Sequence, residues 1–155
     1  MVLPQRQDSL DAAAGYFKRM AAIYDKTYRG KHYLMGIALS NLASVYLAGH
    51  RYAEAEPIYR QAIAMFTATQ GPQHLNTGIA RIKLGRDLLL EHRLAEAAVE
   101  SRAGYEILSR QADPSIPFLV SARKDLAVEY DSLGQPLLAA RFREELAGTL
   151  KTAKR

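Results

Sequence analysis

The 155-residue sequence contains no cysteine, and this absence excludes disulfide bonds and thiolate metal sites. It also contains no uninterrupted run of about 18 apolar residues, so we expect no transmembrane helix. The amino-terminal stretch MVLPQRQDSL lacks the apolar segment of a secretory signal peptide. Together these absences predict a cytoplasmic protein without a membrane partner.

Dense runs of positive charge are also scarce, although the formal net charge is +5. Lysine and arginine are interleaved with acidic residues along most of the chain, and a basic cluster first occurs in the final segment, KTAKR. That pattern is typical of solvated helical surfaces. It leaves nucleic-acid binding as a minor alternative. An acidic peptide is the other partner class that a net positive charge favours.

The sequence lacks the short motifs that mark common catalytic sites. It has no HExxH zinc motif, no glycine-rich phosphate loop and no nucleophile elbow. We therefore expect no catalytic residue and no cofactor. The prediction that follows is a protein that is not an enzyme.

What the sequence contains instead is an internal repeat with a period of 42 residues. The segment HRYAEAEPIYRQA begins at His50, and the related segment HRLAEAAVESRAG begins one period later at His92. Leu42 recurs in the same way as Leu84 and Leu126. The repeat predicts one domain over residues 1–155. We divide it into a half copy at 8–35, full copies at 36–77 and 78–119, and a last copy at 120–155.

Each copy has the apolar spacing of two helices separated by a short break. Ala38, Leu42 and Tyr46 follow one another at i, i+4 and i+8 and form one stripe on a first helix. Second helices are expected over residues 52–69, 94–111 and 136–150, with an equivalent near 9–28. Gly49 and Gly134 are expected to end first helices in a left-handed conformation.

Small residues recur where the two helices of a copy should approach each other most closely. A larger side chain at such a contact would force the helices apart, so these residues are expected to be buried. They are Ala43, Gly85 and Ala127 on the first helices, and Ala55, Ala97 and Ala139 on the second.

The pattern resembles the tetratricopeptide repeat (TPR) family, through Leu42-Ala43, Tyr46, Tyr52, Ala55 and their equivalents in the other copies. The chain is similar to the kinesin-light-chain subclass in its 42-residue spacing, in the segment NLASVYLAGHRYAEAEPIYRQAIAMF and in the histidine before the first helix of each full copy. We expect a bacterial member. The resemblance implies an all-α fold. This fold is a right-handed superhelix of stacked antiparallel helix pairs, with about 3.5 repeats and seven helices.

The four histidines form two pairs whose members are separated by one repeat, His32 with His74 and His50 with His92. Packed helices lie about 8–10 Å apart, so the members of a pair are expected to be too distant to share a ligand. Zinc requires its ligands at about 2.0–2.3 Å from one point. We therefore predict no metal site and interpret the histidines as structural.

On this resemblance, the free faces of the first helices should line a concave groove for a peptide or partner segment. Asn41 matches an asparagine with which TPR proteins hold a peptide backbone, and its amide can both donate and accept hydrogen bonds. Lys83, Arg86 and Lys124 are expected to add contacts to a carboxylate. The alternative interpretation is that these are solvated charges on helix faces. The predicted groove residues are Ile37, Ser40, Asn41, Ser44, Ile79, Ile82, Lys83, Arg86, Lys124, Asp125 and Val128.

The favoured function is a non-catalytic scaffold that binds a protein or peptide partner, acidic partners included. The alternative is a regulatory or sensory repeat segment of a larger signalling enzyme, such as a bacterial protein kinase. The apolar side of residues 10–24, with Leu10, Phe17 and Ile23, is expected to lack a neighbour. Either a second copy of the chain or an adjoining part of a longer parent chain would cover it.

Overall fold

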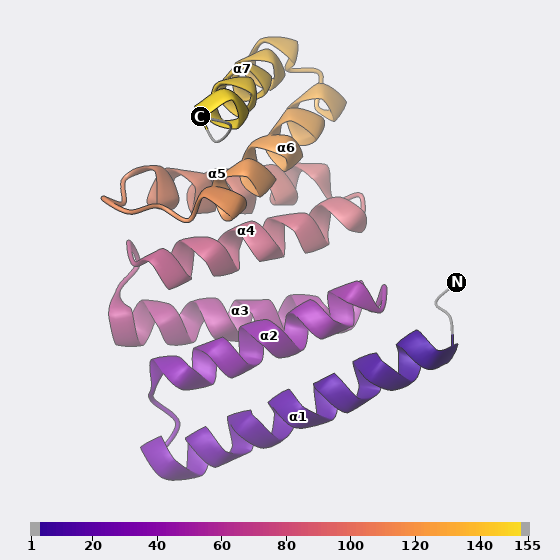
Figure 1. Cartoon of the computed structure of the whole chain (residues 1–155), viewed down its shortest axis with the longest axis vertical. Helices are drawn as coiled ribbons and strands as arrows, with labels where there is room; N and C mark the ends of the chain where they lie inside the picture. Colours follow the sequence, from indigo (N-terminus) through magenta and orange to yellow (C-terminus); the bar gives the residue numbers. More distant parts are fainter. Residues whose placement is uncertain (1–3, 153–155) are drawn as a thin grey trace.

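The computed structural model describes residues 4–152, which form a single stack of helices without an intervening strand (Figure 1). The stack rises from α1 at the bottom of Figure 1 to α7 at the top. It confirms the predicted all-α fold of successively packed helices. Their bounds are α1 Pro4–Tyr28, α2 Tyr33–Ala48, α3 Tyr52–Gln70, α4 Leu75–Leu90, α5 Leu94–Ser109, α6 Ile116–Ser132 and α7 Pro136–Thr152.

The helices divide into an inner and an outer set. Each helix packs against the next in sequence, and in addition α2 contacts α4 and α4 contacts α6. Among the described residues, α1, α3, α5 and α7 contact only their even-numbered neighbours. Because the even-numbered helices lie closer together, the stack curves toward them. None of the helices within residues 4–152 combines the length and apolar character needed to cross a lipid bilayer.

Two of the histidines begin helices of the inner set. The Nδ1 atom of His32 accepts a hydrogen bond from the backbone N–H of Leu34, at 3.2 Å, and His74 accepts one from the N–H of Asn76, at 3.1 Å. Both histidines have extended backbones before α2 and α4. They therefore act as N-caps, which satisfy donors that the first helical turn leaves unpaired.

The other two histidines turn the chain inside each helix pair. His50 and His92 have φ values of 58° and 61°, and Gly134 has a φ of 70° at the equivalent position of the last copy. The left-handed assignment of Gly134 is thus confirmed. That of Gly49 was wrong by one residue, because its φ is −87°. A left-handed conformation costs a residue with a Cβ about 1–2 kcal/mol, and glycine avoids this cost.

The small residues lie at the closest helix contacts. Ala55, Ala97 and Ala139 are fully buried. A Cβ atom built on Gly85 would lie 2.2 Å from Ser101 Oγ and 2.8 Å from the Ser101 backbone nitrogen. The α4–α5 contact therefore requires glycine on one side and a small residue on the other.

In the last helix pair, α6 and α7, the aromatic residue of the core lies one residue before the position that the repeat predicts. The repeat places Arg143 at the position of Tyr59, and Arg143 is exposed and pairs with Asp131. The adjacent Phe142 is buried instead, with its ring stacked on Tyr130 at a centroid distance of 5.8 Å. A one-residue shift along α7 thus restores an aromatic core to the last layer.

Candidate peptide-binding groove

The inner side of the stack contains a hollow of about 230 Å³ where α2, α4 and the start of α6 meet. Five of the predicted groove residues line it together: Ile37, Ser40, Asn41, Ile79 and Lys83. Asn76, Phe66 and Phe118 complete its wall. The hollow combines apolar surfaces with a few polar groups, as small ligand and peptide-side-chain sites commonly do.

Lys83 provides the positive charge of the hollow. Its Nζ donates a hydrogen bond to Ser40 Oγ at 3.3 Å and lies 5.8 Å from the centre of the Phe118 ring. Partial burial lowers the pKa of Lys83 below its usual range, because desolvation disfavours the ammonium ion. In residues 4–152 the ammonium has no carboxylate partner within 4 Å, so it retains unused hydrogen-bond donors.

Asn41 provides an uncommitted amide. The side chain is half-buried at the edge of the hollow and forms no hydrogen bond with another residue of the described part of the chain. An amide offers two N–H donors and an oxygen acceptor. Its position beside Ser40 and Lys83 therefore leaves both donor and acceptor capacity facing the hollow.

Arg86 and Asp125 join two inner helices by an ion pair. Arg86 Nη1 of α4 donates to Asp125 Oδ1 of α6. Asp125 is only 2% exposed, and burial raises the pKa of its carboxyl above the usual range although Arg86 opposes the shift. The carboxylate is therefore occupied by Arg86 and is not open to a ligand. Lys124 and Val128 are exposed on α6 and do not line the hollow.

Two other predicted groove residues are turned into the protein. Ser44 Oγ donates to the carbonyl of Ser40 at 2.8 Å and lies 3.0 Å from the Tyr59 hydroxyl. Ile82 is 2% exposed and packs in a core cluster with Ile107. Both residues support the helices behind the hollow rather than its surface.

Sequence reasoning did not include Phe66, Asn76 and Phe118, because it considered only one face of each first helix. Phe66 comes from α3, Asn76 is on the first turn of α4, and Phe118 is on the first turn of α6. The return loops that precede α4 and α6 were the available signal. Asn76 and Phe118 directly follow these loops and border the hollow, whereas Phe66 lies before the first of them, on α3.

Two fully buried carboxyl groups were also missed. Asp87 and Glu129 occupy the same repeat position on α4 and α6, where the first full copy has Val45. Burial raises the pKa of Asp87 to about 7 and that of Glu129 to about 8. Acidic residues at a position that is apolar in a neighbouring copy were the signal for them. Neither lines the inner hollow.

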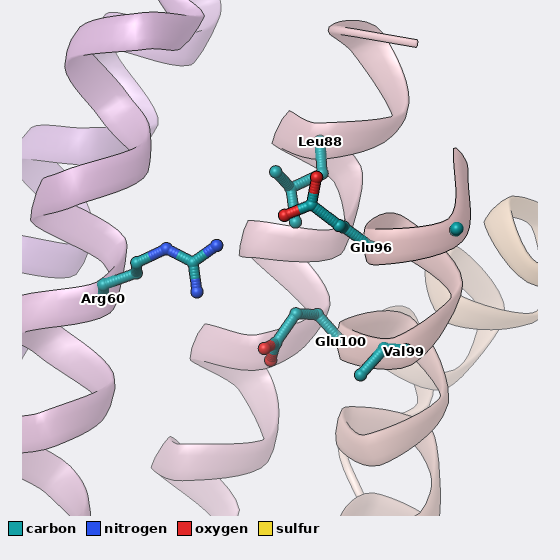
Figure 2. Close-up of a pocket in the computed structure, with 6 residues that line it drawn as sticks. Arg60, Leu88, Glu96, Val99 and Glu100 are labelled. Carbon is teal, nitrogen blue, oxygen red and sulfur yellow. The ribbon is translucent and has the colours of Figure 1, made fainter. Parts of the chain in front are cut away.

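The outer side contains a second hollow, of about 340 Å³, between α3 and α5 (Figure 2). Figure 2 shows Arg60 extending from α3 toward Glu96 and Glu100 of α5. The charged side chains of this outer hollow already have partners within the chain. Arg60 pairs with Glu56, and Glu100 pairs with Arg81. Because uncommitted polar groups are found at the inner hollow, the inner hollow is the better candidate for a binding site.

A metal site has no support in the described residues. Within residues 4–152, no group of three histidine, aspartate or glutamate side chains is arranged so that it could hold a metal ion. His32 and His74 use their Nδ1 atoms as helix caps. These two histidines therefore have structural roles at helix ends.

The stacked helix pairs and the hollow on their inner side define a class of protein, the helical-repeat solenoid. The sequence profile of the tetratricopeptide repeat matches residues 1–68 and, in a second match, residues 34–110. The chain belongs to the tetratricopeptide repeat family. Members of this family generally bind protein partners and are typically non-catalytic. No curated protein sequence matches the chain.

Solved structures of kinesin-light-chain-like proteins share the fold. BtubC (BKLC) from P. vanneervenii superimposes with a TM-score of 0.85 at 16% identity, over 95% of this chain and 59% of BtubC. The chain thus spans less than two thirds of that protein. A putative kinesin light chain from Podospora anserina, with nearly identical TPR-like repeats, gives a TM-score of 0.78 at 21% identity. That match covers 97% of this chain and 72% of the other.

Proposed function

We propose that the chain is a non-catalytic scaffold that binds an extended segment of a protein partner in the inner hollow. The observation that supports this is the uncommitted Asn41 amide beside the Lys83 ammonium, with apolar walls around both. A peptide backbone presents both N–H and C=O groups. One amide side chain can pair with both kinds of group.

The walls and the charge indicate what such a segment would contain. The apolar part of the hollow, which includes Ile37, Ile79 and Phe118, suits one apolar side chain of the partner. A carboxylate next to Lys83 would give the partly desolvated ammonium a charge-assisted hydrogen bond, which is stronger than its bond to Ser40. Acidic segments are therefore the favoured ligands.

The test uses peptides selected from a random library displayed on phage, with affinities measured by fluorescence anisotropy. Asn41→Ala is expected to weaken binding about five- to tenfold, the equivalent of one net hydrogen bond. Lys83→Glu is expected to weaken it more, because the charge at the hollow is reversed. Arg60→Glu, the same charge reversal at the outer hollow, is the matched control and should leave the affinity unchanged.

Thermal unfolding of the same variants separates binding from folding. The proposal requires that Asn41→Ala and Lys83→Glu keep the stability of the wild-type chain while they lose affinity. Loss of stability in proportion to affinity would assign both residues a structural role. Unchanged affinity in both variants would place the peptide site elsewhere.

A further inference from the structure

The outer face of α1 carries an exposed stripe that no described helix covers. Its members are spaced four, four, three, four and three residues apart, which keeps them on one side of a helix. Tyr16 is 54% exposed and Ile23 is 60% exposed. The opposite face, with Ala14 and Phe17, packs against the core that includes α2. The expectation that Phe17 lacks a neighbour was therefore wrong, because Phe17 and Ile23 lie on opposite sides of α1. The stripe consists of Asp8, Ala12, Tyr16, Arg19, Ile23 and Lys26.

The charges of this stripe are complementary to those of a second copy of the stripe that runs in the opposite direction. An acidic residue, Asp8, is at the amino end, a basic residue, Lys26, is at the carboxyl end, and Ala12, Tyr16 and Ile23 lie between them. In residues 4–152, Asp8, Arg19 and Lys26 form no ion pair within 4 Å. Their charges are therefore open to a second molecule.

We propose that two copies of the chain pair through their α1 helices in antiparallel orientation, about a twofold axis that passes between Tyr16 and Arg19 of the stripe. In this arrangement Asp8 faces the partner's Lys26, and Ala12 faces the partner's Ile23. Tyr16 faces the partner's Arg19, as a cation over an aromatic ring. A twofold interface repeats every one of these contacts.

The antiparallel direction follows from the charges. A parallel pair would place Asp8 beside the partner's Asp8 and Lys26 beside the partner's Lys26, which is repulsive at both ends. The antiparallel pair replaces both repulsions with attractions. It also sets the small Ala12 against the larger Ile23 of the partner, so the two helices can approach closely.

The association is expected to be weak and concentration-dependent. A stable protein interface buries about 800 Å² per partner, and a single helix stripe buries less than that. Sedimentation equilibrium of the 155-residue chain, from micromolar to low-millimolar concentration, is the measurement. The wild-type chain should shift from monomer to dimer across this range.

Two sets of variants test the interface itself. Ile23→Glu should abolish the dimer, while Val99→Glu, at an equally exposed apolar residue of α5, should leave it unchanged. Asp8→Lys and Lys26→Asp should each weaken association about tenfold, because each changes two symmetric ion pairs into repulsions. The double variant restores opposite charges and should recover the affinity.

Each result bears on the proposal. A wild-type chain that stays monomeric over the whole range would overturn it, and so would a dimer that survives Ile23→Glu. Failure of the charge-exchanged double variant to recover would overturn the antiparallel register. Circular dichroism of every variant checks that the fold is intact, which is expected because the changed side chains are exposed.

Discussion

Replacing the buried Glu129 by glutamine should make the protein more stable at alkaline pH and leave it unchanged in acid. Glu129 is fully buried on α6, where its Oε1 accepts a hydrogen bond of 2.8 Å from Ser101 Oγ. Its Oε2 is buried without a hydrogen-bond partner among the described residues. Burial is the main reason that its pKa rises from 4.5 to about 8. Asp125 adds to the shift, while Ser101 and Arg86 oppose it.

The sign of the effect follows from the proton count. In the unfolded chain Glu129 loses its proton near pH 4.5, whereas in the folded protein it keeps the proton up to about pH 8. The stabilisation from this group is therefore complete below about pH 4.5 and is lost as the pH rises to about 8. Each pH unit of this interval costs about 1.4 kcal/mol, so the whole interval costs about 3–5 kcal/mol.

Urea unfolding followed by circular dichroism measures this difference. Glutamine keeps an oxygen acceptor for Ser101 Oγ but cannot ionise. Glu129→Gln should lie within about 1 kcal/mol of the wild-type chain near pH 5 and exceed it by about 3 kcal/mol near pH 8.5. Glu144→Gln, at an exposed position of α7, is the control and should show no such difference.

The result that would refute the reasoning is a stability difference between Glu129→Gln and the wild-type chain that does not change with pH. It would mean that Glu129 ionises alike in the folded and unfolded states. Asp87, whose pKa burial raises to about 7, should give the wild-type chain a further loss of stability in the same direction. The contribution of Glu129 is therefore obtained from the difference in unfolding free energy between the variant and the wild-type chain at each pH.

Three more substitutions test the helix contacts and helix ends, with the free energy of unfolding as the common measurement. Gly85→Ala should cost about 1–3 kcal/mol because its Cβ would meet Ser101, whereas Gly148→Ala, in open space on α7, should cost nothing. His92→Gly should stabilise by about 0.5–1 kcal/mol by relieving a φ of 61°, and a loss of stability would contradict that origin. His74→Ala should cost about 1 kcal/mol through the lost cap of α4, and His74→Asn should restore it.

The helix stack could be predicted from the sequence because the 42-residue period places equivalent side chains in equivalent contacts. Ala55, Ala97 and Ala139 are buried alike since each lies where two helices touch. The 42-residue period is less informative where two copies fill their cores with side chains of similar size from different positions. Phe142 fills the last core one residue away from the repeat position, and a periodic pattern does not specify which neighbouring residue does so.

The inner surface was less predictable because its chemistry depends on the next layer. Asn41, Lys83 and Asp125 occupy one repeat position, yet each has a different environment. Asn41 is uncommitted, Lys83 is partly buried beside Phe118 of a later helix, and Asp125 is buried against Arg86 of an earlier one. The period fixes the direction of a side chain relative to its own helix. Its partners come from adjacent copies, whose sequences have diverged, so burial and charge at this surface follow from contacts between repeats.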